Sequence, residues 1–156
     1  MSLFRRRERL LVAAGTIAVA ILAPPLSAST PEQEAVLGPI NALFDGMSKR
    51  DAVEIKASVI PGGMMVLMRD GKPEQISFED FAERVGRLGK AVIEERIHNP
   101  LIRIENDLAV VLAPFEFLVD GKVDHCGTDL FNLVRVDGKW LVAGVADTGR
   151  KACGAK

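Results

Sequence analysis

The segment 125–142, HCGTDLFNLVRVDGKWLV, decides the fold. Apolar and polar residues alternate on both sides of Asp137-Gly138, and an Asp-Gly pair in that setting is the strongest short-range signal for a β-hairpin. Asn106-Asp107 and Asp120-Gly121 mark two further turns upstream. The second half of the chain is therefore predicted to form four consecutive antiparallel strands.

Two-residue turns also predict which residues face one another across these strands. Counting back from the turns places Glu116 opposite His125, and Asp129 opposite Leu112 and Ala146. Glu116, His125 and Asp129 would then share one face of the sheet. Both faces are largely apolar, which fits a sheet covered by helices on one side and by a partner on the other. A bulge that slips the register by one residue would exchange the two faces beyond it.

Helices are predicted before these strands. Thr30, with Gln33 three residues later, forms a capping box at the start of the first helix. A short second helix is predicted around residues 51–58 and a strand over 64–68, and Ser77 caps a further amphipathic helix. The acidic segment Glu94-Glu95-Arg96 begins another strand and is interpreted as a solvated edge.

The first 29 residues differ from the rest of the chain. A basic start at Arg5–Arg9 precedes an apolar run from Leu10 to Ala23, two prolines and small residues. This order predicts an export signal cleaved near Ser29, and hence a periplasmic or secreted domain over residues 30–156 with no membrane attachment. A retained anchor is the alternative, although the apolar run is shorter than the roughly 20 residues that span a bilayer.

Composition excludes several classes of function. With 20 Lys plus Arg against 21 Asp plus Glu, the chain has no electrostatic reason to bind nucleic acid. An exported chain favours a disulfide between Cys126 and Cys153, with two unpaired thiols as the alternative. Two histidines without His-x-x-x-His or Cys-x-x-Cys spacing predict neither a metal site nor a cofactor that depends on one.

The order of elements, the run His125–Val142 and the following Asp147-Thr148 resemble the nuclear-transport-factor-2-like superfamily, within it the exported lumazine-binding-like and polyketide-cyclase-like branch. The resemblance implies an α+β fold in which a curved antiparallel sheet wraps around two or three N-terminal helices as a cone. It also implies a pocket at the open end and a homodimer through the outer sheet face. Ketosteroid-isomerase-type members use an oxyanion-binding Tyr, and this chain has no Tyr.

Two functions are compatible with this fold, which hosts both enzymes and members without catalysis. The first is binding of a small apolar or aromatic ligand, or of a protein partner, without catalysis and without a cofactor. The second is a cofactor-free isomerase, dehydratase or hydrolase in which His125 works with Asp129 or Glu116 as an acid–base pair. The sequence favours the first, because the second needs such a pair to face the pocket. The residues predicted to line the ligand pocket, or else to pack in the core, are Phe44, Met47, Phe78, Phe81, Phe131 and Trp140.

Overall fold

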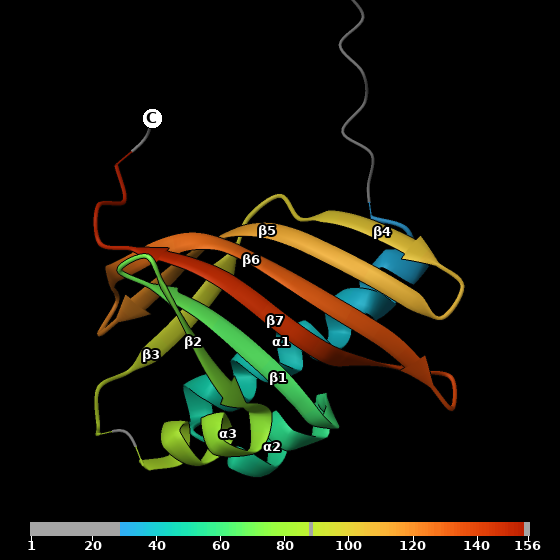
Figure 1. The fold of residues 1–156 in the computed structure, drawn as a ribbon, viewed down its shortest axis with the longest axis horizontal. Coiled ribbons are helices and arrows are strands. Elements are labelled where there is room, and N and C mark those ends of the chain that lie inside the picture. The colour runs from blue at the N-terminus through green and yellow to red at the C-terminus, as the bar shows by residue number, and fades with distance from the viewer. Residues whose placement is uncertain (1–28, 88, 155–156) are drawn as a thin grey trace, which may run out of the picture.

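The computed structural model describes residues 29–87 and 89–154, in which a curved, open sheet arches over three helices (Figure 1). The helices are α1 (Pro31–Lys49), α2 (Ala52–Ala57) and α3 (Phe78–Arg87). The strands are β1 (Val59–Arg69), β2 (Lys72–Ser77), β3 (Ile93–Ile97), β4 (Leu101–Glu105), β5 (Leu108–Val119), β6 (Lys122–Val136) and β7 (Lys139–Arg150). The α+β cone is confirmed. Residues 1–28 of the predicted export signal lie outside the described residues, so the signal stays a prediction.

The helices begin where their capping residues predict. At the start of α1, the Thr30 hydroxyl accepts a hydrogen bond from the Gln33 backbone N–H at 3.2 Å, and the Gln33 side chain accepts one from the Thr30 N–H at 2.9 Å. The Asp51 carboxylate caps α2, and the Ser77 hydroxyl accepts from the Asp80 N–H at the start of α3. Local sequence therefore fixes where each helix enters the cone.

The seven strands form one sheet in the order β2-β1-β7-β6-β5-β3, with β4 pairing with β5 beside β3. Neighbouring strands are antiparallel except β1 and β7, which run parallel. The predicted hairpin turns are confirmed, and Asp120 and Gly121 both adopt the positive φ angles that a two-residue hairpin needs, 50° and 75°. Four consecutive strands, β4 to β7, follow from these turns.

The predicted register is correct only near the turns. A β-bulge between Phe117 and Leu118 shifts the pairing by one residue, so His125 faces Phe117 and Glu116 faces Cys126. The prediction that Glu116 lies opposite His125 is therefore wrong, and Glu116 is on the outer face of the sheet.

The β6–β7 hairpin carries a second irregularity, between Asn132 and Leu133. Because the register shifts there, Asp129 pairs with Asp147 on β7 rather than with Ala146, and the bulge beside Phe117 pairs it with Ala113 on β5 rather than with Leu112. The prediction for Asp129 is correct only in part, because Asp129 shares the inner face with His125 but not with Glu116.

The core lies between the inner face of the sheet and the three helices. Its largest fully buried side chains come from both layers: Val36, Ile40, Leu43, Ile55, Phe78, Val111, Phe131, Leu133 and Val142. At the open end the predicted disulfide joins Cys126 on β6 to Cys153 beyond β7, with 5.8 Å between the Cα atoms. In the described part of the chain, no helix is both long and apolar enough to cross a membrane.

Candidate functional site

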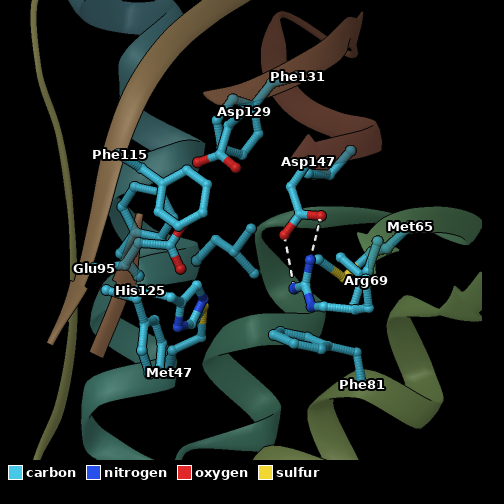
Figure 2. Close-up of a pocket in the computed structure, with 15 residues that line it drawn as sticks. Met47, Met65, Arg69, Phe81, Glu95, Phe115, His125, Asp129, Phe131 and Asp147 are labelled. Carbon is cyan, nitrogen blue, oxygen red and sulfur yellow. Dashed lines mark hydrogen bonds and ion pairs between the residues drawn. The ribbon is translucent and has the colours of Figure 1, made fainter. Parts of the chain in front are cut away.

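A cavity of about 180 Å³, here called the chamber, opens between the inner face of the sheet and helices α1 and α3 (Figure 2). Aromatic and aliphatic side chains make most of its wall: Leu43, Phe44, Met47, Met65, Leu67, Phe81, Phe115, Phe117, Phe131 and Val145. Five polar residues complete it: Arg69, Glu95, His125, Asp129 and Asp147. An apolar wall with a few convergent polar groups is the usual form of a small-molecule site.

Four of the six residues predicted to line a pocket do line the chamber, namely Phe44, Met47, Phe81 and Phe131. The structure places Phe78 in the core with no exposed surface. Trp140 lies away from the chamber, where the Arg135 guanidinium covers its ring at 4.4 Å from the ring centre. The sequence could not separate these two from the others, because core and pocket residues share the same helical or strand spacing.

Two carboxyl groups, from Glu95 on β3 and Asp129 on β6, turn toward the centre of the chamber (Figure 2). Asp129 is only 2% exposed. Burial, reinforced by the neighbouring Glu95 and Asp147 carboxylates, raises the pKa of Asp129 to about 10. Burial also raises the pKa of Glu95 to about 7, although the interaction with Asp129 opposes this change. At neutral pH the pair therefore holds at least one proton between its two carboxyl groups.

An ion pair closes the opposite side of the chamber. Arg69 donates two hydrogen bonds to the Asp147 carboxylate, at 2.7 and 2.8 Å, and the Met68 backbone N–H donates a third to it at 3.0 Å. The hydrogen bond to Asp147 raises the pKa of Arg69, so the guanidinium stays charged. The pair brings together the ends of β1 and β7, which run side by side in parallel.

His125 forms part of the chamber wall next to the carboxyl pair. Its ring stacks on Phe117 with the ring centres 4.8 Å apart and meets the edge of Phe115. Its Nδ1 lies 2.9 Å from the Asp124 carboxylate, which leaves Nε2 as the ring nitrogen available to a ligand. Hydrogen bonds from Lys151 and His125 hold the pKa of Asp124 below its usual range, so this carboxylate is charged.

The predicted group of Glu116, His125 and Asp129 is only partly assembled. His125 and Asp129 both line the chamber, but Glu116 is on the outer face, 3.5 Å from His98. Its place beside Asp129 is taken by Glu95, and the interpretation of Glu95 as part of a solvated edge is wrong. Glu94 and Arg96, its neighbours, do pair with each other at the surface.

One sequence signal could have identified Glu95. Side chains alternate along a strand, so Glu95 lies on the same face as Ile93 and Ile97. Ile93 is buried and Ile97 packs against the core. A carboxylate between two inward apolar residues marks a buried acid, which is costly unless it is protonated or paired.

The chamber shows no arrangement suited to a metal ion. Across residues 29–87 and 89–154, no group of three or more His, Cys, Asp or Glu side chains is placed to hold one.

Comparison with known proteins places the chain in a family. Residues 31–145 match the family model described as "Putative lumazine-binding". The chain belongs to this family. No curated protein matches the sequence.

Solved structures of the nuclear-transport-factor-2-like fold are similar to the family member described here. One from Cytophaga hutchinsonii has a TM-score of 0.66 at 18% identity, over 78% of this chain and 100% of that one. One of unknown function from Shewanella baltica has a TM-score of 0.60 at 18% identity, over 79% and 98%. Another of unknown function, from Methylobacillus flagellatus, has a TM-score of 0.61 at 19% identity, over 80% and 97%. At these identities the similarity shows the fold alone.

Proposed function

We propose that the protein binds a small, flat, mostly apolar molecule in the chamber, without catalysis and without a cofactor. The observation that carries the proposal is the Asp129 carboxyl, which is buried in an aromatic cavity and whose Oδ2 has no hydrogen-bond partner within the described ranges. A buried polar atom is normally hydrogen-bonded, so an unpaired one facing a cavity fits a ligand atom. Because this carboxyl is protonated at neutral pH, its natural partner is a carbonyl oxygen or a ring nitrogen.

Lumazine is a flat bicyclic heterocycle whose carbonyl groups and ring nitrogens are hydrogen-bond acceptors of the kind that the Asp129 carboxyl would bind. The family description supports a ligand of this class. The Phe44, Phe81 and Phe131 rings supply apolar surface for the flat faces, and the Glu95 and Asp129 pair offers one acceptor and one donor for the polar edge.

The test is calorimetric titration of the purified, disulfide-bonded protein with lumazine. We expect binding to weaken about tenfold or more in Phe81→Ala, because that substitution removes the apolar surface that one half-buried ring offers to the chamber. The matched control is Val110→Ala, on the outer face of β5, which should bind lumazine as the unmodified protein does. Absence of binding by lumazine and by related flat heterocycles would overturn the proposal.

Catalysis by proton transfer is the second candidate, and the Glu95–Asp129 pair is the observation that favours it. The pKa values of about 7 and about 10, both raised mainly by burial, suit a base and a hydrogen-bond donor at neutral pH. In this mechanism the Glu95 carboxylate removes a proton from the carbon beside a ligand carbonyl, and the Asp129 O–H stabilises the resulting enolate oxygen. Returning that proton to another carbon completes an isomerisation.

Deuterium exchange separates the two candidates. If the protein is catalytic, a carbonyl compound that binds in the chamber will exchange its α-protons with solvent D₂O, as followed by NMR, and Glu95→Gln will abolish the exchange while binding persists. Binding without exchange supports the first candidate. His125→Gln tests whether the base is the histidine, as the sequence suggests.

We further propose that the domain is exported and that its Cys126–Cys153 disulfide forms after export. The basic, apolar and small-residue order of residues 1–29 supports this. Mass spectrometry of the secreted protein should show a chain that begins near Thr30 and whose mass is about two units below that of the reduced form. An intact N-terminus would contradict the export signal.

The outer sheet face supports the predicted homodimer. One row of side chains across five strands is entirely apolar, formed by Leu101, Leu112, Leu130, Ala146 and Val66. Leu101 and Leu112 in this row are 51% and 41% exposed. We propose that a second copy of the chain covers the row, because an exposed contiguous apolar patch is typical of an interface. Light scattering should report a dimer for the unmodified protein and a monomer for Leu112→Glu.

A further inference from the structure

A second cavity, here called the vestibule, adjoins the chamber at the open end of the cone. It has a volume of about 300 Å³, and its charged and polar lining consists of Arg69, Asp70, Asp124, His125, Arg150 and Lys151. Arg69 and His125 also line the chamber. The two cavities therefore meet at these two side chains.

The two cavities differ in charge as well as in polarity. The vestibule lining contains three basic side chains, Arg69, Arg150 and Lys151, against the two acidic residues Asp70 and Asp124, and Arg69 is already paired with Asp147. The Asp124 carboxylate already accepts a hydrogen bond from Lys151 at 2.7 Å and lies 2.9 Å from His125.

Arg150 is the cation that remains available. Within the parts of the chain that the structure describes, its side chain forms no ion pair with a carboxylate, and the residue is exposed at the end of β7. The opposite rim carries Asp70, in the turn between β1 and β2. Arg150 favours an anionic ligand and Asp70 disfavours one, so the balance between these two residues affects which charge the vestibule binds.

Arg69 has hydrogen-bond donors to spare at the junction of the two cavities. A guanidinium carries five N–H donors. Three are used, two on Asp147 and one on the Met68 carbonyl oxygen. The two that remain have no partner among the described residues, and Asp147 holds the guanidinium in place (Figure 2). A fixed donor pair between an apolar cavity and a charged one suits an oxygen group on a ligand.

We propose that the vestibule is a second subsite, which binds a carboxylate attached by a short link to the flat ring that occupies the chamber. The proposal rests on the proposed ligand-binding function and specifies the ligand class. Arg69 contacts the carboxylate at the junction, and Arg150 with Lys151 provides the positive field around it. The Cys126–Cys153 disulfide keeps Lys151 near the vestibule, because it ties down the chain that follows β7.

Two probes of equal ring and similar length test the subsite: 2-naphthyloxyacetate, which carries a carboxylate, and its uncharged N-methylamide. Both are titrated by calorimetry into the full disulfide-bonded chain at pH 7 and low salt. We expect the carboxylate to bind about fivefold more tightly, since exposed charge interactions contribute up to about 1 kcal/mol. The preference should shrink in about 0.5 M salt, which screens such charges.

Variants at the surface of the vestibule supply the controls. Arg150→Gln combined with Lys151→Gln should remove the preference for the carboxylate, and Asp70→Asn should increase it, while neither change alters binding of the amide. Equal binding of both probes, unchanged in these variants, would overturn the subsite and leave the chamber function standing. If neither probe binds, the subsite fails, and the lumazine titration decides the chamber function separately.

Discussion

The inner and outer faces of the sheet are built from alternating residues of the same strands, and at one point on β6 the usual distribution of polar and apolar residues is reversed. On β6, Asp129 is buried on the inner face, whereas its neighbour Leu130 belongs to the apolar row of the outer face. Soluble proteins normally bury the leucine and expose the aspartate. Folding alone does not require Asp129 inside or Leu130 outside, which fits the binding site proposed for the inner face and the interface proposed for the outer face.

The largest difference between the faces should appear in stability. Phe131, on the inner face, is 1% exposed and packs edge-on against Phe44. Phe131→Ala should lower the free energy of unfolding by about 3–5 kcal/mol, because it removes a buried ring and leaves a cavity. Val110→Ala, on the outer face and 40% exposed, should cost less than about 1 kcal/mol. Urea unfolding of both variants measures this, and equal losses would contradict the assignment of the faces.

The next prediction concerns the disulfide, which joins β6 to the chain that follows β7. Cys126 and Cys153 are 27 positions apart, and on the chain-entropy model a bridge across such a loop contributes about 3.5 kcal/mol. We expect Cys126→Ser combined with Cys153→Ser to lower the free energy of unfolding by about this amount. Binding of an uncharged ring in the chamber should persist, because most of the chamber wall lies away from the bridge.

The matched control for the disulfide is chemical. Adding reductant to the unmodified protein should reproduce the loss seen in the double serine variant, and adding it to the variant should change nothing. A variant as stable as the oxidised protein would show that the crosslink does not restrict the unfolded chain.

Local signals predicted the elements of the fold, but they could not predict the site. Capping boxes and Asp-Gly turns depend on residues a few positions apart, and the helix starts and hairpins they predicted are confirmed. The face on which each strand residue lies depends on the register, and one bulge beside Phe117 sends Glu116 outward. Glu95 reaches Asp129 only because β3 pairs with β5, a contact that no local pattern encodes.

The carboxyl pair on the inner face predicts how stability depends on pH. Burial raises the pKa of Asp129 to about 10 and that of Glu95 to about 7, so the folded state binds more protons than the unfolded state above about pH 4. The stabilisation that this pair contributes is fully present below about pH 4 and is lost as pH rises through the folded-state pKa values. For each group, the free energy of unfolding decreases by at most about 1.4 kcal/mol per pH unit.

The measurement is urea unfolding at several values from pH 5 to pH 9, compared with Asp129→Asn. This variant replaces the titrating group by a neutral one of similar shape, so its stability should fall less steeply between pH 6 and pH 9. Glu95→Gln should remove the part of the loss that occurs between pH 5 and about pH 7. A wild-type stability that increases over this range would contradict the burial of the pair.

The smallest effect is expected at Glu116, the acid that the sequence placed beside His125. On the outer face it is 40% exposed in its side chain and 3.5 Å from His98, an arrangement that contributes little to stability. Glu116→Gln should change the free energy of unfolding by less than about 0.5 kcal/mol and leave lumazine binding unchanged. Glu95→Gln, the matched change on the inner face, should alter both the pH profile and the affinity. If the two variants behaved alike, the placement of Glu95 in the chamber and of Glu116 on the outer face would be wrong, since adjacent positions of the β3–β5 pairing put one acid in the chamber and the other in solvent.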